Sequence, residues 1–170
     1  MSALYRVELL SQTHDRAAFA CGNETLDRYF SQQAGQDVRR GLAVVYVLAD
    51  VVTGTVAGYY TLSATSIEFG ALTPATTKRL PRYPTLPATL LGRLARDTRY
   101  RGRGAGEALI LDALKRSLDS SRHIASFAVV VDAIDKDAQT FYESYDFVRS
   151  PQQEYRLFLP MATIAGLFSP

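Results

Sequence analysis

Three glycines lie within five residues of the stretch RYRGRGAGEALI, residues 99–110, and this spacing constrains the fold more than any other feature of the chain. Glycine is rare inside helices because each one costs roughly 1 kcal/mol relative to alanine there. An apolar segment, ATLLGRLARD, precedes the glycines, and a stripe of Ile110, Ala113, Leu114 and Leu118 follows them at helical spacing. The pattern therefore predicts a strand, a glycine turn and an amphipathic helix, in that order.

This order of elements is typical of an anion site, because free backbone N–H groups and the positive end of a helix dipole meet where no Cβ atom intervenes. A Walker phosphate loop requires a lysine after its last glycine, and none of these glycines has one. A dinucleotide fingerprint requires glycine where this chain has Glu107 or Leu109. The stretch instead fits Arg/Gln-x-x-Gly-x-Gly/Ala at Arg101, Gly104 and Gly106. A plain strand-to-helix turn is the alternative interpretation.

Basic residues are concentrated in the window from Lys78 to Arg103. The window holds eight of them and one acid, Asp97, so it carries +7, whereas the whole chain carries +2 and the remainder −5. Like charges at this density repel one another unless an anion lies among them, so the cluster predicts anion binding. For any single arginine, a solvated basic rim is the alternative. The basic members are Lys78, Arg79, Arg82, Arg93, Arg96, Arg99, Arg101 and Arg103.

The length predicts one compact folded domain over residues 1–170. The 47% hydrophobic content is that of an ordinary globular protein rather than a disordered or fibrous one. No apolar run approaches the roughly 20 residues of a membrane span, and Arg6 and Glu8 interrupt the N-terminal apolar stretch, so we expect a cytoplasmic protein without membrane contact. With only Cys21 and two histidines, we expect neither a disulfide nor a bound metal.

The periodicity along the chain predicts a mixed α/β domain with helices on both faces of a central sheet. Asn23 and Asp135 are the expected N-caps of two helices, and Thr53-Gly54 is the expected turn of a hairpin. The predicted strands are 5–9, 42–50, 56–66, 88–97, 126–133 and 154–160, and the predicted helices are 13–20, 24–40, 105–120 and 136–147. Residues 67–87 are predicted to be a long connection, and 161–168 an apolar tail.

The pattern at Arg101, Gly104 and Gly106 resembles the coenzyme A pyrophosphate loop of the GNAT acyltransferase superfamily. Over nearly its whole length the chain also resembles the GNAT toxins of bacterial type II toxin–antitoxin modules. Four segments carry this resemblance in the right order: FACGNETLDRYFSQQAGQD, VAGYYTLSATSIEF, LGRLARDTRYRGRGAGEALILDAL and AQTFYESYDFVRSP. The resemblance implies a single GNAT domain with a mixed, mostly antiparallel sheet.

The same resemblance implies an activity and partners. The expected activity is acetyl transfer from acetyl-CoA to the free α-amino group of aminoacyl-tRNA, which stops translation. The expected partners are a ribbon-helix-helix antitoxin, operator DNA bound through that antitoxin, and a second copy of the chain in a dimer. Two rival functions stay open: acetylation of a small amine or a protein N-terminus, and a non-catalytic coenzyme-binding module.

The family pattern assigns expected roles to particular residues. A backbone N–H of the LGRLARD strand is expected to hold the thioester carbonyl, and the glycine loop to hold the pyrophosphate. The expected coenzyme-binding residues are Leu94, Ala95, Arg101, Gly102, Arg103, Gly104, Ala105 and Gly106. Lys78, Arg79, Arg82 and Arg93 are expected to bind the tRNA backbone, giving salt-dependent affinity with little sequence readout.

Tyr142 matches the tyrosine that these toxins use as general acid. With an ordinary pKa of about 10, a tyrosine stays protonated at neutral pH and can give its proton to a thiolate. The alternative is a core role, because Ala138, Phe141, Tyr142 and Tyr145 form a stripe at helical spacing. A tyrosine can, however, pack its ring and still present its hydroxyl.

No side chain stands out as a base that would deprotonate the acceptor amine, and His14 is interpreted as a surface or capping residue. An α-amino group titrates near 7.7–8.0 whereas lysine titrates near 10.4, so a useful fraction of an α-amine is already neutral at pH 7. The missing base therefore favours an α-amine acceptor. Asp146 stands where the family often has glycine, and we expect a left-handed residue in a slightly different turn there.

Overall fold

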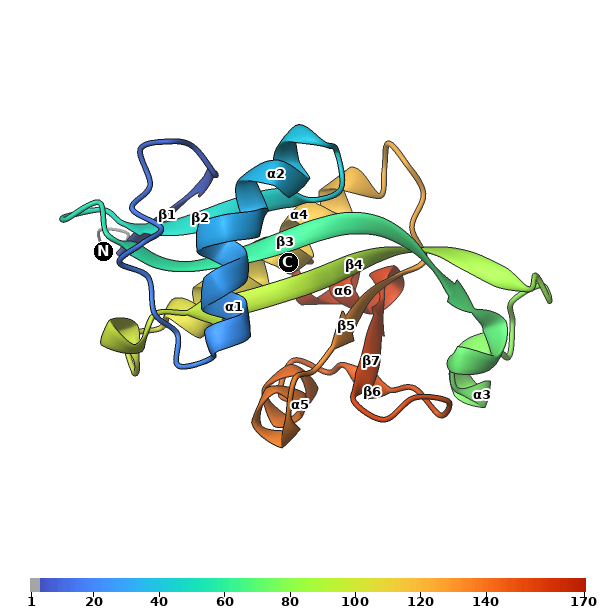
Figure 1. Cartoon of the computed structure of the whole chain (residues 1–170). Helices are drawn as coiled ribbons and strands as arrows, with labels where there is room; N and C mark the ends of the chain where they lie inside the picture. Colours follow the sequence, from blue (N-terminus) through green and yellow to red (C-terminus); the bar gives the residue numbers. More distant parts are fainter. Residues whose placement is uncertain (1–3) are drawn as a thin grey trace. The chain divides into compact units, whose positions relative to one another are not determined.

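The computed structural model describes residues 4–170, which form two compact units. The first unit comprises the chain up to Ser63 together with Gly92–Ala113, and the second comprises Ala64–Leu91 and Leu114–Pro170. Seven strands follow one another in the hydrogen-bonding order β1-β2-β3-β4-β5-β7-β6 (Figure 1). The pairing of β4 with β5 is parallel, whereas β1–β2, β2–β3, β5–β7 and β6–β7 are antiparallel, so the predicted mixed and mostly antiparallel sheet is confirmed.

In the first unit the chain begins with an antiparallel ribbon. Strand β1 (Tyr5–Leu9) pairs with β2 (Val44–Asp50), and β2 pairs with β3 (Val56–Glu68), whose last residues continue into the second unit. The predicted hairpin turn is confirmed, because Gly54 has a φ of 74° and its N–H donates to the carbonyl of Asp50 at 2.8 Å. An L side chain at this position would be strained.

The predicted helix from residue 24 to residue 40 is confirmed, although a π-helical turn interrupts it. It consists of α1 (Glu24–Arg28), the π-helix Tyr29–Gln33 and α2 (Ala34–Arg39). Asn23 caps it, because its side chain accepts from the N–H of Leu26 at 3.0 Å.

Helices cover both faces of the sheet in the first unit, as predicted. Successive residues of β3 point to opposite faces. Tyr59 stacks on Phe30 of the π-helix, with ring centroids 4.3 Å apart, whereas Gly58 faces Leu109 of α4 (Ala105–Ser120). A Cβ on Gly58 would stand 2.6 Å from Leu109 and 2.8 Å from the carbonyl oxygen of Ala95, so glycine is required for this close approach.

The predicted short helix at residues 13–20 is wrong, because this segment forms turns. Its backbone instead forms hydrogen bonds with residues that lie far along the chain. The N–H of Ala20 donates to the carboxylate of Asp97, and the carbonyl of Ala20 accepts from the N–H of Thr98. The interpretation of His14 as a surface residue is also wrong: its side chain is buried, accepts from the N–H of Ser11 and is bonded to Glu8.

In the second unit, β4 (Thr85–Arg96) pairs in parallel with β5 (Ala128–Asp132) up to Leu91, and β7 (Arg156–Pro160) lies between β5 and the short β6 (Val148–Arg149). The long connection is shorter than predicted and contains the 3₁₀-helix Phe69–Ala71 and α3 (Pro74–Thr77). Helix α5 (Lys136–Glu143) begins after its predicted cap Asp135. The expected apolar tail forms α6 (Met161–Leu167), which buries Met161 and Ile164.

Candidate active site

The end of β4 lies in the first unit and leads to the glycine turn. The N–H of Asp97 donates to the carbonyl of Ala57 in β3, and the carbonyl of Ala95 also faces β3. Because successive residues of a strand direct their backbone groups to alternate edges, Leu94 and Arg96 direct theirs to the other edge. The parallel pairing with β5 ends at Leu91, five residues before β4 does.

Asp97 anchors the turn that follows β4. Its buried carboxylate accepts from the N–H groups of Ala20 and Arg99 and forms a two-pronged ion pair with the Arg99 guanidinium at 2.9 and 3.0 Å. Burial alone would raise the pKa of Asp97, but the bonds from Arg99 and Ala20 outweigh it and hold that pKa below its usual value. The 3₁₀-helix Thr98–Tyr100 therefore begins from a fixed, charged cap.

Tyr100 and Arg103 fix the next part of the turn. The buried Tyr100 hydroxyl donates to Asp50 at 2.7 Å, and the guanidinium carbon of Arg103 lies 4.5 Å from the centre of the Tyr100 ring. The hydroxyl of Tyr5 donates to the carbonyl of Arg103 at 2.7 Å. The backbone of the glycine turn is thus held from β1, β2 and the 3₁₀-helix.

Gly102 and Gly104 both adopt the left-handed conformation, with φ values of 72° and 77°. A Cβ at either position would meet no atom within 4 Å, so the space beside this backbone is open. Helix α4 begins at Ala105, and the N–H of Ala108 makes the first helical bond, to Gly104. The earlier N–H groups of the helix remain free of helical partners and point toward its N-terminal end. The open space and these donors fit an anionic, phosphate-bearing ligand.

Tyr142 lies in α5 of the second unit. Its side chain is only 7% exposed and makes edge contacts with the rings of Phe141 and Phe147. Burial raises the pKa of Tyr142 well above its ordinary value, so the hydroxyl is protonated at neutral pH. Within residues 4–170 this hydroxyl has no hydrogen-bond partner, and it is available as a donor. Asp146, after α5, has a φ of 71°, so the expected left-handed residue is confirmed.

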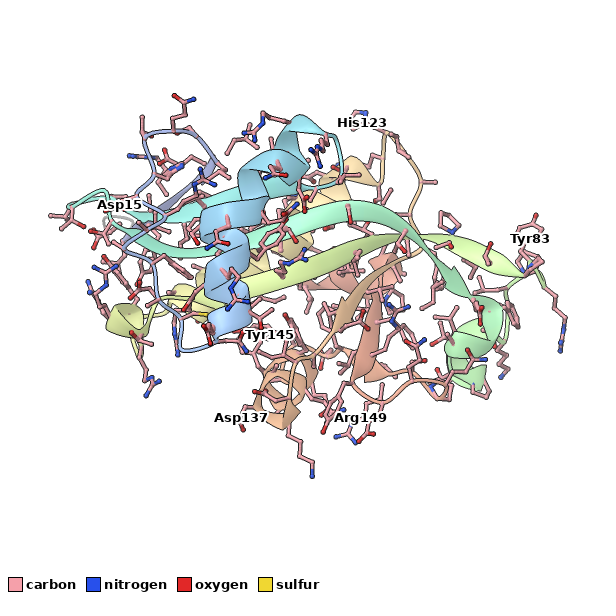
Figure 2. All side chains as sticks on the ribbon, viewed as in Figure 1. Asp15, Tyr83, His123, Asp137, Tyr145 and Arg149 are labelled. Atoms are coloured by element: carbon pink, nitrogen blue, oxygen red, sulfur yellow. The ribbon has the colours of Figure 1, made fainter. Side chains whose placement is uncertain are left out.

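The basic residues expected to bind tRNA fall into two settings. Lys78, Arg79 and Arg82 are exposed in the second unit and form no ion pair within the described chain. Lys78 and Arg82 line a pocket of about 500 Å³ whose apolar members include Phe69 and Leu80. Tyr83, beside Arg82, is 60% exposed and projects from the connection between α3 and β4 in Figure 2.

Arg93 differs, because it lies in the first unit and its guanidinium carbon stacks 3.5 Å from the centre of the Tyr29 ring. The Tyr29 hydroxyl donates to Asp37 at 2.8 Å. Burial and this bond raise the pKa of Tyr29 to about 12. Arg93 is therefore held on the ring of a neutral tyrosine.

Sequence reasoning missed a polar pocket of about 600 Å³ in the second unit. Its walls come from α5 and from residues 149–155, and Arg149, labelled in Figure 2, is held by two bonds to Glu143 at 3.0 Å. Gln139 lines this pocket although its side chain is buried. Gln139 falls on the buried side of α5, one turn before Tyr142, but no feature of the sequence marked residues 149–155 as a pocket wall.

Within residues 4–170, no group of three or more His, Cys, Asp or Glu side chains is placed to hold a metal ion. No helix in the described part of the chain is long and apolar enough to cross a membrane.

The strand order, the parallel β4–β5 pair and the glycine turn at the start of α4 are those of an acetyltransferase of the GNAT class. The family model described as "Acetyltransferase (GNAT) domain" matches residues 87–163. The "Probable toxin TacT" of Sinorhizobium fredii (strain NBRC 101917 / NGR234) is 32% identical over 161 residues, which cover 91% of this chain and 89% of the relative. The "tRNA-acetylating toxin" of Mycobacterium tuberculosis (strain ATCC 25618 / H37Rv) is 30% identical over 168 residues, 98% of each chain.

Solved structures show the same likeness. AtaT complexed with acetyl-methionyl-tRNAfMet superimposes with a TM-score of 0.89 at 29% identity over 97% of this chain and 99% of that one. A tyrosine-to-phenylalanine mutant of AtaT, bound to the C-terminus of the antitoxin AtaR and acetyl-CoA, superimposes with a TM-score of 0.83 at 27% identity over 99% of this chain and 100% of that one. The AtaT–AtaR complex bound to DNA superimposes with a TM-score of 0.78 at 28% identity over 96% of this chain and 99% of that one. The chain belongs to the GNAT acetyltransferase family, with the TacT and tRNA-acetylating toxins, and its cosubstrate is acetyl-CoA.

Proposed function

We propose that this protein is a toxin that transfers the acetyl group of acetyl-CoA to the α-amino group of aminoacyl-tRNA and so blocks translation. The observation that carries the proposal is similarity over nearly the full length of both chains to a tRNA-acetylating toxin, together with the match to AtaT holding acetyl-methionyl-tRNAfMet. Acetyl-CoA supplies the activated acetyl thioester.

In the first unit, the glycine turn and the start of α4 would hold the coenzyme pyrophosphate. The free N–H groups at Ala105 and Gly106 would donate to its oxygens, and the glycines leave room for them. Arg101 is exposed and without an ion pair in the described chain, so its charge is available to the same anion. At the edge of β4, the alternation of backbone groups favours Leu94 and Arg96, rather than Ala95, as donors toward the thioester carbonyl.

In the second unit, Tyr142 would donate its proton to the departing thiolate. Its raised pKa keeps the hydroxyl protonated at physiological pH, and the absence of a competing partner within residues 4–170 leaves the hydrogen atom free to point at a ligand. The conjugate acid of the departing thiolate has an ordinary pKa of about 8.5, below that of tyrosine, so the proton transfer has to be coupled to cleavage of the C–S bond, as negative charge develops on sulfur. The proposal therefore requires the Tyr142 hydroxyl to lie within hydrogen-bond reach of the sulfur when acetyl-CoA binds.

The experiment that tests this function is transfer of radiolabelled acetyl from acetyl-CoA to a pool of charged tRNA. Wild type is compared with Tyr142→Phe, and deacylated tRNA is the control. We expect label on charged tRNA only, with transfer falling about 100-fold or more in Tyr142→Phe while coenzyme binding is retained. Label on a small amine or a protein N-terminus instead of tRNA would replace the proposal with the rival acetyltransferase function. A Tyr142→Phe variant with unchanged transfer would remove Tyr142 from the mechanism.

The proposal extends to organisation and partners. We propose one GNAT domain over residues 1–170, a homodimer, and location in the cytoplasm, where charged tRNA is used. We further propose neutralisation by a ribbon-helix-helix antitoxin that carries the toxin to operator DNA, in line with the AtaT–AtaR and AtaT–AtaR–DNA structures. Light scattering of the purified chain tests the dimer, and co-expression with any short reading frame that adjoins its gene tests the antitoxin.

A further inference from the structure

Two arginines converge over a glycine on the surface of α2 in the first unit. The point where a Cβ of Gly35 would stand lies 3.3 Å from Nη1 of Arg39 and 3.4 Å from Nη1 of Arg16. Gly35 has an ordinary helical backbone, so its conformation does not require glycine. What the missing side chain provides is room in which two guanidinium groups meet.

The two arginines come from different segments, and one of them is anchored. Arg16 lies in the turns before α1, and its Nη1 donates to the carbonyl of Phe30 at 3.3 Å. Phe30 belongs to the π-helical turn just before α2, and π-helical turns often mark functional positions. Arg39 reaches the same point from one helical turn beyond Gly35 and is exposed.

The charges of these two arginines are not paired in the described part of the chain. Within residues 4–170, neither Arg16 nor Arg39 forms an ion pair. Asp37, the carboxylate of α2, is engaged elsewhere, since it accepts from the Tyr29 hydroxyl and from the Gln33 amide. Two guanidinium groups held this close repel one another, and an anion between them removes the repulsion while accepting from both planar forks.

We propose that Arg16, Gly35 and Arg39 form a binding site for a backbone phosphate of the tRNA acceptor, separate from the basic residues 78–82. The proposal rests on the function proposed above. A phosphate is favoured because its oxygens can accept from two guanidinium groups at once, and because the exposed residues in the turn before Gly35, Ser31–Gln33, are polar, although Val38 after it is 41% exposed. The site would add contacts that position tRNA without reading its sequence.

The test introduces a carboxylate into the site by substitution of Gly35. Gly35→Glu puts an anion between the two arginines, at the i,i+4 spacing that favours a bond to Arg39, and Gly35→Gln is a matched control of the same size without charge. Arg39→Ala removes one cation directly. Binding of fluorescently labelled deacylated tRNA is measured by anisotropy between about 50 and 200 mM salt. A second readout is acetyl transfer to an aminoacyl ester of adenosine, which has no phosphate, with the KM for acetyl-CoA.

We expect Gly35→Glu to weaken tRNA binding by about tenfold or more near 0.1 M salt. The slope of the logarithm of the association constant against the logarithm of salt concentration is negative, and it should become less steep by about one to two. Arg39→Ala should make this slope less steep by about one, and the tRNA affinity of Gly35→Gln should stay within about threefold of wild type. The adenosine ester reaction and the KM for acetyl-CoA should be unchanged in all three variants.

Several outcomes would overturn the inference. If Gly35→Glu and Gly35→Gln bind tRNA equally well while the wild type acetylates charged tRNA, the phosphate site is overturned and the proposed function stands. A raised KM for acetyl-CoA would assign the site to the coenzyme instead. Unchanged tRNA binding with weaker binding of a poly-glutamate peptide would assign it to an acidic protein partner. A wild type that acetylates the ester but neither binds nor acetylates tRNA would remove both proposals.

Discussion

Two basic segments of this protein hold their cations in different ways. At residues 97–103, Arg99 is paired with a buried carboxylate and Arg103 is stacked on a buried tyrosine, whereas Arg101 is exposed without an ion pair within residues 4–170. At residues 78–82, the three cations are exposed and form no ion pair in the described chain, and Arg82 makes only a distant contact with the Phe69 ring, 5.9 Å from its centre. A fixed set of groups can place one small ligand with accuracy, because little side-chain freedom is lost when the ligand binds. Exposed, unpaired cations suit a long polyanion, whose phosphates are bound by charge rather than by geometry.

The largest expected effect comes from closing the space beside the fixed segment. Gly104→Val adds a branched side chain where φ is 77° and where the proposed pyrophosphate lies. We expect kcat/KM for acetyl-CoA to fall about 100-fold or more, since the backbone is strained and the approach is blocked. Gly54→Val is the matched control, because Gly54 has a φ of 74°, equally open surroundings and a place in the β2–β3 turn. If kcat/KM for acetyl-CoA falls equally in both variants, backbone strain alone explains the result, and the loop is not the pyrophosphate site.

The next effect tests whether the fixed segment depends on its buried carboxylate. Asp97→Ala leaves the N–H of Ala20 and the Arg99 side chain without their acceptor, which should lower the free energy of unfolding by about 2 kcal/mol. Denaturation with urea measures this loss. Asp97 has a folded pKa below its unfolded value of about 3.9, so its contribution is present above that pH and is lost as the pH falls through the folded pKa.

The gap in stability between wild type and Asp97→Ala should therefore narrow on acidification below about pH 4. Glu143→Gln is the comparison variant, because Glu143 also receives a two-pronged bond from an arginine but is partly exposed. We expect it to lose much less stability than Asp97→Ala. Equal losses would mean that burial of the carboxylate does not matter.

The sequence predicted elements whose stabilising contacts are local and failed where the contacts come from far along the chain. Asn23 and Asp135 cap their helices as predicted, because a cap is bonded only two or three residues away. The segment at residues 13–20 has the composition of a helix, but Ala20 is bonded to Asp97 and Thr98, 77 and 78 residues later. Those bonds replace the helical ones, and no local pattern reveals them.

The same distinction applies to the candidate site. The glycine turn, the helix after it and the position of Tyr142 on a helix are predictable, because a spacing pattern and a family resemblance mark them, and their roles stay predictions. The convergence of Arg16 and Arg39 over Gly35 could not be found, since Arg16 reaches α2 only through the path of the turns before α1. Arg93 was found as a cation, but its stacking on Tyr29 depends on packing between a strand and a helix.

A smaller effect tests the unpaired segment. Replacing Lys78, Arg79 and Arg82 together by alanine removes three exposed charges, so we expect the free energy of unfolding to change by less than about 0.5 kcal/mol. The affinity for deacylated tRNA should fall about tenfold near 0.1 M salt, and the negative slope of log K against log salt should become less steep by up to about three. The KM for acetyl-CoA should stay the same. A variant that loses stability as Asp97→Ala does would show that the two segments are not held differently.

The smallest expected effect concerns Arg93, which shares features of both segments. The sequence predicts that it binds tRNA, yet its guanidinium carbon lies 3.5 Å from the centre of the Tyr29 ring, closer than the 4.5 Å between Arg103 and the Tyr100 ring. If Arg93 is a fixed group, Arg93→Ala should lower the free energy of unfolding by about 0.5–1 kcal/mol through the lost cation–π contact, and it should leave the salt dependence of tRNA binding unchanged. If it behaves like residues 78–82, the negative slope of log K against log salt for tRNA binding should become less steep by about one, with no loss of stability. A double-mutant cycle of Arg93→Ala with Tyr29→Leu decides between them, because Tyr29→Leu alone also removes the bond to Asp37 and the packing of a buried ring. A fixed Arg93 gives a coupling energy of about 0.5–1 kcal/mol between the two substitutions, whereas a free Arg93 gives none.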